Sequence, residues 1–385
     1  MNKIFKKLIF LFFIVFCCYS KVNSEEKIKI GLLVPMTGDN KNLGQLIIKA
    51  TKMALKNIST DKLEIYPRDT NSNPSKTFKS ASELKEMGVS IVIGPVFYEN
   101  LIHLNEIDDV TFLSFTNKTI NLPKNVISTG VNATSQLETI NKFIKQNEIK
   151  KTIFLTPKLN YEPEIKKAIK KSKIKIFKYY IYDTEPTKLT KQIEKITNYK
   201  TRKQNVLDEI KRIEDSDLDD EDKKRKIDKL KKFYTIGKLN FDSIIISDFD
   251  ESLKSVITSL LYTDVLPKDK YIITLNQWFD ESLINENTLQ PIYYPSISNK
   301  NLKKFNEQFN KEYYESPNHL SLLSYDLVGL IYYLSTKNSI LEISNLFKKK
   351  NSFKGKIGIF DIENNKINHR LNFYQIDKGK LKEIF

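Results

Sequence analysis

Cysteine is almost absent from this sequence of 385 residues, since the only two, Cys17 and Cys18, lie side by side near the N terminus. Thiols are needed for disulfides, for cysteine nucleophiles and for sulfur-ligated metals. The predicted removal of the first 24 residues leaves a mature chain with no thiol. The composition therefore excludes these three kinds of chemistry for the mature protein.

Histidine and the familiar catalytic motifs are also scarce. The three histidines, His103, His319 and His369, lie far apart, and none has metal-ligand spacing with a partner. The sequence contains no G-x-S-x-G, no P-loop, no H-E-x-x-H and no G-x-G-x-x-G. We therefore expect a protein that is not an enzyme and that holds no metal and no cofactor.

Long apolar runs are limited to one, over residues 8–18, which follows three lysines and precedes small residues. This layout is typical of a secretory signal, so we predict a signal peptide over 1–24, cleaved after Ser20 or Ser24, and a periplasmic location. An uncleaved anchor is one alternative, although the run is short of the ~20 residues that span a bilayer. Lipidation is another, but Phe16, before the first cysteine, is not the small residue that lipoprotein signals need.

Arginine is rare, and the formal net charge of +16 comes from lysines spread along the whole chain. A nucleic-acid-binding face concentrates its positive charge, so no nucleic-acid partner is expected. Apolar residues make up 40% of the chain and charged residues 29%, which is a globular composition and not a disordered one.

Strands and helices are expected to alternate over the first third of the mature chain. We predict strands over 27–34, 63–66, 89–93 and 111–115. Helices are predicted over 43–57 and from Asn73 to Gly88, with a further helical stretch after Pro95. This βα rhythm predicts a parallel sheet with helices on both faces.

The same rhythm resumes in the second half. Strands are predicted over 151–156, 174–182, 241–247, 270–275, 356–360, 371–376 and 380–385. Helices are predicted over 134–147, 162–171, 252–262, 302–314, 320–335 and 339–350. A chain of this size favours two lobes over one core.

A helical region of unusual length covers 188–234. Its middle, 214–222, is strongly acidic, and a basic run follows directly. Ser216 and Asp219 match a capping box that would restart a helix there. We interpret the region as a helical hairpin with an acidic tip, either a binding element or a solvated elaboration with no binding role.

Ligands of parallel α/β sheets lie beyond the carboxyl ends of the strands. The residues that follow the predicted strands combine hydroxyls, free amides and aromatic rings, as a small-molecule site needs. The candidates are Met36, Thr37, Pro95, Val96, Phe97, Ser114, Thr116, Asn117, Tyr161, Asp248, Phe249, Asp250 and Trp278.

Several short motifs occur in an order that is similar to a known family. They are KIGLLVPMTG (29–38), RDT (68–70), IGP (93–95), SFTN (114–117) and SYD (324–326), the last adding Tyr325 and Asp326 to the candidates. In this order the chain resembles the type I periplasmic binding proteins of the leucine-binding group. YKTRK (199–203), WFD (278–280) and FKGKIGIF (353–360) resemble more closely the penicillin-binding-protein activator branch, which has a charged helical insertion.

The resemblance implies a two-lobed α/β fold with parallel sheets, helices on their faces and three chain crossings. Lobe 1 is expected over 27–131 and 275–336, and lobe 2 over 132–274 and 337–385. It also implies one of two functions: regulation of peptidoglycan synthases, or solute binding for an ABC transporter permease.

Amino-acid-binding members of this group hold the ligand carboxylate with hydroxyls and amides near the third strand, and its ammonium with an acid of the second lobe. Val96 and Phe97 stand here where a Ser/Thr-rich turn is expected, and Asp248 or Asp250 could supply the acid. A carboxylate without its hydroxyl partners is costly to bury, so amino-acid capture is disfavoured.

Overall fold

The computed structural model describes residues 27–275, 281–336 and 343–385. The predicted signal peptide and Trp278 lie outside these ranges. Among the residues that are described, no helix has the length and apolar character needed to cross a bilayer.

The first sheet contains five parallel strands in the order β2-β1-β3-β4-β5. They are β1 (Ile28–Val34), β2 (Leu63–Asp69), β3 (Ile91–Ile93), β4 (Thr111–Ser114) and β5 (Val126–Ser128). They alternate with α2 (Lys41–Ile58), α3 (Pro74–Glu86) and the short 3-10 helices η1 (Tyr98–Leu101) and η2 (Leu104–Glu106). The predicted start of α3 is confirmed, since Asn73 caps it by accepting a hydrogen bond from Lys76 N, and Gly88 follows it at φ 78°. The three-residue strand β5 was not predicted.

The second sheet contains seven strands in the order β15-β14-β10-β9-β8-β6-β7. They are β6 (Thr152–Pro157), β7 (Lys178–Tyr182), β8 (Ser243–Ile246), β9 (Tyr271–Thr274), β10 (Ile292–Ser296), β14 (Asn372–Asp377) and β15 (Lys380–Glu383). Its helices are α4 (Ala133–Gln146), α5 (Glu162–Ser172), α6 (Pro186–Ile196), α9 (Asp250–Tyr262) and α10 (Glu281–Asn285), with the 3-10 turn η3 (Asn287–Leu289). The strands from β7 to β10 are parallel, whereas β14 and β15 are antiparallel.

The remaining elements return to the first sheet. Helices α11 (Asn299–Tyr313) and α12 (His319–Ser335) pack against α2, and α13 (Ile343–Leu346) leads to a small antiparallel sheet of β11 (Asn351–Lys354), β12 (Ile359–Glu363) and β13 (Lys366–Arg370). Phe360, Ile362 and Ile367 of that sheet belong to the same apolar core as β1 and α12.

Two segments therefore join a different sheet or core from the one that the predicted lobe division assigns to them. The unpredicted β10 belongs to the second sheet, and β11–β13 pack on the core of the first lobe. We propose that the lobe boundaries follow the sheets, which assigns 292–296 to lobe 2 and 343–370 to lobe 1.

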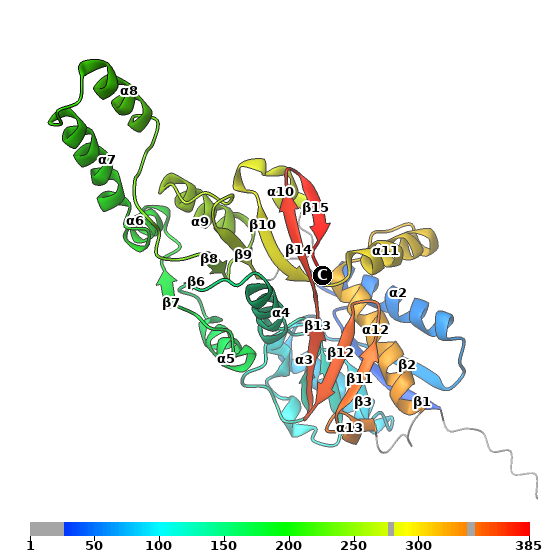
Figure 1. Cartoon of the computed structure of the whole chain (residues 1–385). Coiled ribbons are helices and arrows are strands. Elements are labelled where there is room, and N and C mark those ends of the chain that lie inside the picture. Colours follow the sequence, from blue (N-terminus) through cyan, green and yellow to red (C-terminus); the bar gives the residue numbers. More distant parts are fainter. Residues whose placement is uncertain (1–26, 276–280, 337–342) are drawn as a thin grey trace, which may run out of the picture.

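The chain crosses between the lobes three times, at 129–132, at 297–298 and at Leu371. Strands β13 and β14, separated only by Leu371, run almost continuously from one lobe into the other (Figure 1). Tyr374 joins two crossings, because its hydroxyl donates to Ile297 O (3.0 Å) and accepts from Asn299 N (3.0 Å). The second and third crossings are thereby held side by side.

His369 joins the other pair of crossings. Its Nε2 lies 2.8 Å from Thr129 O, and its backbone N donates to Ser135 Oγ (2.8 Å). A carbonyl only accepts, so Nε2 carries the proton, and the buried Nδ1 has no hydrogen-bond partner among the described residues. Burial lowers the pKa of His369 to about 4, against the opposing effect of Thr129.

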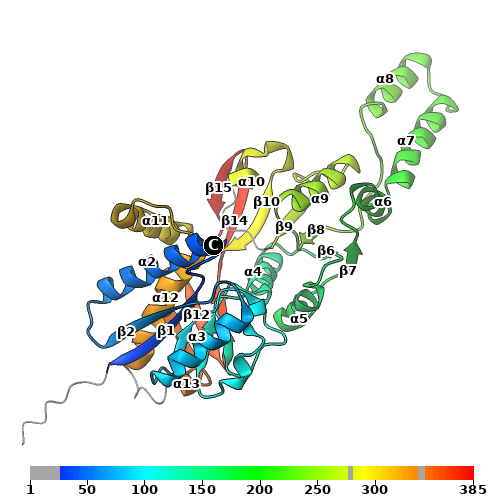
Figure 2. The ribbon, with the colours of Figure 1, turned by 180° about the vertical axis from the view of Figure 1, so that it is seen from behind.

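The predicted helical hairpin projects from the second lobe, well away from both sheets (Figures 1 and 2). It consists of α7 (Tyr199–Glu214) and α8 (Asp220–Leu230), and the segment 199–234 is named the arm below. Arg202 anchors it, since the buried guanidinium donates to Thr263 O (3.0 Å) and Thr235 Oγ1 (2.7 Å). The predicted capping box was one turn early: Asp219 itself caps α8 by accepting from Asp222 N, and Ser216 bonds back to Ile213 O.

The buried histidine predicts a specific pH dependence of stability. The unfolded chain binds a proton at His369 near pH 6.5, but the folded chain does so only near pH 4, so folding loses free energy as the pH falls through this window. Between pH 7 and pH 5 this group alone should cost about 2 kcal/mol.

Urea unfolding of the wild type and of His369→Gln at both pH values measures this difference. The variant should lose about 2 kcal/mol less than the wild type over that interval. The exposed His103→Gln is the control and should behave as the wild type does. Equal losses in wild type and His369→Gln would contradict the assignment.

Candidate functional site

The end of β1 is held by an aspartate of β2. The Asp69 carboxylate accepts hydrogen bonds from Met36 N (2.7 Å), Thr37 N (3.2 Å) and Thr37 Oγ1 (2.6 Å), and from Lys76 Nζ (2.6 Å). Burial raises the pKa of Asp69, but the hydrogen bonds from Lys76 and Thr37 outweigh it, so that the pKa lies well below its usual range. The Thr37 hydroxyl therefore donates its hydrogen bond to Asp69 and not to a ligand.

The ends of β3 and β4 are bonded to one another. Ser114, which is fully buried, donates its hydroxyl to Pro95 O (2.9 Å), and Thr116 Oγ1 accepts from Lys118 N (3.2 Å). Val96 is buried, and Phe97 packs against the core of the first lobe. Asn117 alone in this group is exposed. The structure thus brings the predicted residues of this lobe together, but the hydroxyls of Thr37 and Ser114 donate within the protein, and Thr116 Oγ1 accepts a hydrogen bond there.

The predicted residues of the second lobe form a second group. Asp248, which is 3% exposed, accepts hydrogen bonds from Tyr182 OH, Ser252 Oγ (2.6 Å) and Phe249 N (3.0 Å). Tyr161 OH lies close by and donates to Ser247 O (2.8 Å). Burial, followed by the nearby Asp248, raises the pKa of both tyrosines, which stay neutral.

Two predicted residues of the loop before α9 face outward. Phe249 is 42% exposed, and Asp250, at φ 53°, is exposed at the first position of the helix. An acid at a helix N terminus is stabilised by the helix dipole. In the second lobe, Asp248 at the strand end is therefore buried and accepts three hydrogen bonds within the lobe, whereas Asp250 is a surface residue.

Tyr325 and Asp326 lie away from the strand ends, on α12. Asp326 is 2% exposed and accepts from Lys356 N (2.8 Å) and Ile357 N (2.7 Å), so it holds the turn between β11 and β12. Burial raises the pKa of Asp326 to about 7, against these two amides. A Cβ on Gly355 would lie 2.4 Å from Asp326 Oδ2, which explains the glycine there. Tyr325 OH accepts from Asn57 Nδ2 (3.0 Å).

A contact between the lobes, absent from the sequence prediction, is made by Glu164 of α5. Its carboxylate accepts from Thr119 N (3.0 Å), Thr119 Oγ1 and Ile120 N (3.1 Å), all in the loop that follows β4. Lys167 Nζ donates to Thr119 O (2.6 Å). We name Thr119, Ile120, Glu164 and Lys167 the interlobe latch. Glu164 is 8% exposed, so the latch is shielded from water.

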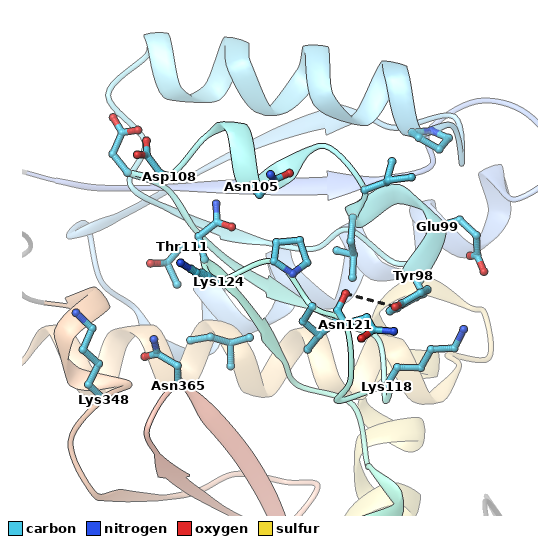
Figure 3. Close-up of a pocket in the computed structure, with 18 residues that line it drawn as sticks. Tyr98, Glu99, Asn105, Asp108, Thr111, Lys118, Asn121, Lys124, Lys348 and Asn365 are labelled. Carbon is cyan, nitrogen blue, oxygen red and sulfur yellow. Dashed lines mark hydrogen bonds between the residues drawn. The ribbon is translucent and has the colours of Figure 1, made fainter. Parts of the chain in front are cut away.

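A large depression lies on the first lobe, along η1, η2 and the loop between β4 and β5 (Figure 3). Its volume is about 1390 Å³, and we name it the lateral trough. Tyr98, Glu99, Lys118 and Asn121 lie at one end, and Asp108, Lys124, Lys348 and Asn365 lie at the other (Figure 3). None of the residues predicted from sequence lines it, although Tyr98 and Lys118 each follow one directly.

Residues 27–200 match the sequence model of the periplasmic binding protein family. No curated protein matches the chain significantly. A branched-chain amino acid ABC transporter protein from Rhodospirillum rubrum is similar to it at a TM-score of 0.69 and 11% identity, over 93% of this chain and 100% of that one.

Two further solved structures represent the two branches named from sequence. The LpoA C-domain from Haemophilus influenzae, a regulator of PBP1A, has a TM-score of 0.61 at 14% identity, over 93% of this chain and all of that one. LivJ from Streptococcus pneumoniae, a branched-chain amino acid binding protein solved with isoleucine, has a TM-score of 0.53 at 18% identity, over 93% and 98%. Identities this low show the shared fold and leave the function open.

The interlobe latch predicts how the lobes respond to a single substitution. Glu164→Ala removes three hydrogen bonds across the lobes and leaves the Thr119 and Ile120 amides without their acceptor, which should destabilise this arrangement of the lobes by about 2 kcal/mol. The radius of gyration from small-angle X-ray scattering should rise. Glu162→Ala, two residues earlier on the same helix and paired with Lys166 of that helix, is the matched control. Identical scattering from Glu164→Ala and the control would show that the latch does not hold the lobes.

Proposed function

Because the chain has the two-lobed fold of the type I periplasmic binding proteins, we propose that it is a non-enzymatic periplasmic protein that docks on a peptidoglycan synthase and regulates it, as a penicillin-binding-protein activator does. The predicted signal peptide over 1–24 supplies export in this proposal. The observation that carries the proposal is the projecting arm, whose surface is exposed although it is firmly anchored.

The strand ends support a protein partner over a captured amino acid. The ligand carboxylate of an amino acid needs free donors, but the hydroxyls of Thr37 and Ser114 already donate within the lobe. The ligand ammonium needs a free acid, but Asp248 already accepts three hydrogen bonds. A ligand that cannot replace these bonds leaves buried polar groups unpaired, which costs about 1–3 kcal/mol each.

The arm carries the exposed apolar surface that a docking protein needs. Leu207 is 56% exposed, Phe233 53% and Tyr234 80%. Helix α8 has 11 residues and none of them is buried, so the lobe itself supplies it with no packing energy. Aromatic side chains are the usual anchors of protein interfaces. A partner that covers Phe233 and Tyr234 would supply the missing burial.

The charges of the arm are separated along its length. Seven carboxylates fall within 214–222, and seven basic residues fall within 223–232. Separated charges of opposite sign steer and orient an incoming partner more than they add affinity. The arm therefore combines an apolar contact with an electrostatic guide.

Replacing two exposed aromatic residues of the arm, Phe233 and Tyr234, tests the proposal. The double variant Phe233→Ala/Tyr234→Ala should bind a purified peptidoglycan synthase at least tenfold more weakly in biolayer interferometry, because the two rings are the apolar anchors. Synthase stimulation should fall in parallel. Tyr314→Ala removes an aromatic ring that is 87% exposed on the first lobe and should change nothing. The absence of synthase binding by the wild type, or unchanged binding by the double variant, would refute the proposal.

Solute capture for an ABC transporter is the second candidate. The fold shared with transporter-linked proteins and the three crossings, which allow hinge closure, favour it. A ligand at a hundred times its Kd stabilises the native state by about 2.7 kcal/mol, which raises the melting temperature measurably. We expect no shift with any of the common amino acids at millimolar concentration. A reproducible shift with one of them would favour solute capture over regulation.

A further inference from the structure

The lateral trough has an apolar floor. Leu101, Ile102, Leu122, Pro123 and Ile127 contribute to its lining. Ile102, between the two 3-10 helices, is 66% exposed, which is a large value for an isoleucine. When a ligand covers an exposed apolar side chain, binding gains about 25 cal/mol of free energy for each Å² of apolar surface that is buried.

Cations stand at both ends of this floor (Figure 3). Lys118 Nζ lies 4.1 Å from the centre of the Tyr98 ring, and Lys348 Nζ donates a hydrogen bond to Asn345 Oδ1 (3.0 Å). Lys124 has no hydrogen bond or ion pair to any residue in the described ranges.

The carboxylates of the trough leave a positive excess. Asp109 is paired with Lys85 (2.7 Å), whereas Glu99 and Asp108 have no such partner in the part of the chain that the structure describes. Lys124 and Lys348 thus outnumber Asp108 at one end of the trough, whereas Lys118 and Glu99 balance at the other. An anion gains most at the end with two lysines, and a cation would compete with the lysine ammoniums at either end.

Hydrogen bonds within the protein hold the wall of the trough, so the trough forms without a ligand. Asn125 Nδ2 donates to three carbonyls of the wall, those of Leu104 (2.8 Å), Ile107 (2.7 Å) and Val110 (3.2 Å). These bonds fix the turn between η2 and β4. A preformed site costs a ligand less ordering energy.

The volume of the trough sets an upper limit on the size of a ligand that it could hold. Ligand pockets of proteins measure about 300–1,000 Å³, and the trough reaches about 1390 Å³. An open trough of this size admits an elongated ligand that lies along its apolar floor. We propose that the lateral trough binds a small organic anion with an extended apolar body, with the body lying on Ile102 and the floor and the acid reaching Lys118 at one end or Lys124 and Lys348 at the other. This site is separate from the strand ends and is independent of the proposed regulatory function.

A pair of probes that differ only in the sign of the head group tests the proposal on the full mature chain. Decanoate should bind at one saturable site in isothermal titration calorimetry, and decyltrimethylammonium should bind at least tenfold more weakly. Anionic phosphatidylglycerol vesicles form a second arm, in which no co-sedimentation is expected. Equal binding of the two probes, no binding of decanoate, or binding to vesicles in its place would overturn the proposal.

Charge and floor variants locate the binding. Lys124→Glu/Lys348→Glu should weaken decanoate binding about tenfold if the acid lies at that end, and Lys118→Glu about threefold to fivefold if it lies at the other. Ile102→Asp should weaken it about tenfold in either case. Lys52→Glu, an exposed lysine of α2, is the matched control and should bind as the wild type does. Wild-type affinity in all three trough variants, with native circular dichroism, would overturn the proposal.

Discussion

The carbonyl oxygens of Ile297 and Thr129 lie at two of the three chain crossings, and side chains of the third crossing's strands bond to both of them. Tyr374 and His369 supply these bonds, and both side chains are almost completely buried. A chain segment that passes between two cores has backbone groups that can be buried without a hydrogen-bond partner. Each such group costs about 1–3 kcal/mol. The relative placement of the two lobes therefore depends on two side chains in the β13–β14 segment. The interlobe latch adds a second, separate connection between the lobes.

Much of the fold follows from local sequence patterns. The parallel strands of both sheets are buried apolar runs, and the helices between them carry caps such as Asn73 and stops such as Gly88 that can be recognised directly. Elements without such signals were missed. Strand β5 has three residues, and β10 contains Pro295, which is unusual inside a sheet. The sequence prediction assigned 337–385 to the second lobe, whereas β11–β13 pack on the core of the first, because their apolar residues do not say which of two cores they join.

The candidate site was predictable only as a set of positions. That the residues after β1, β3 and β4 meet at one edge follows from parallel topology. Whether their hydroxyls are free does not, because the hydrogen bonds from Thr37 to Asp69 and from Ser114 to Pro95 depend on the exact loop geometry. Glu164 illustrates the same limit. In the sequence it is an ordinary acid in the first turn of a helix, yet in the structure it accepts hydrogen bonds from a loop of the other lobe.

The arm's point of attachment has a mechanical meaning. Arg202 fixes the start of α7 to the chain around Thr263, on the second lobe, so the arm turns with that lobe as one body. Sixteen residues of α7 at 1.5 Å each give it a length of about 24 Å. Any rotation about the three crossings is multiplied by this added radius, so the tip sweeps an arc several ångströms longer than the lobe surface does for each ~10° of turn. A small change of angle at the crossings therefore produces a larger displacement at the acidic tip of the arm.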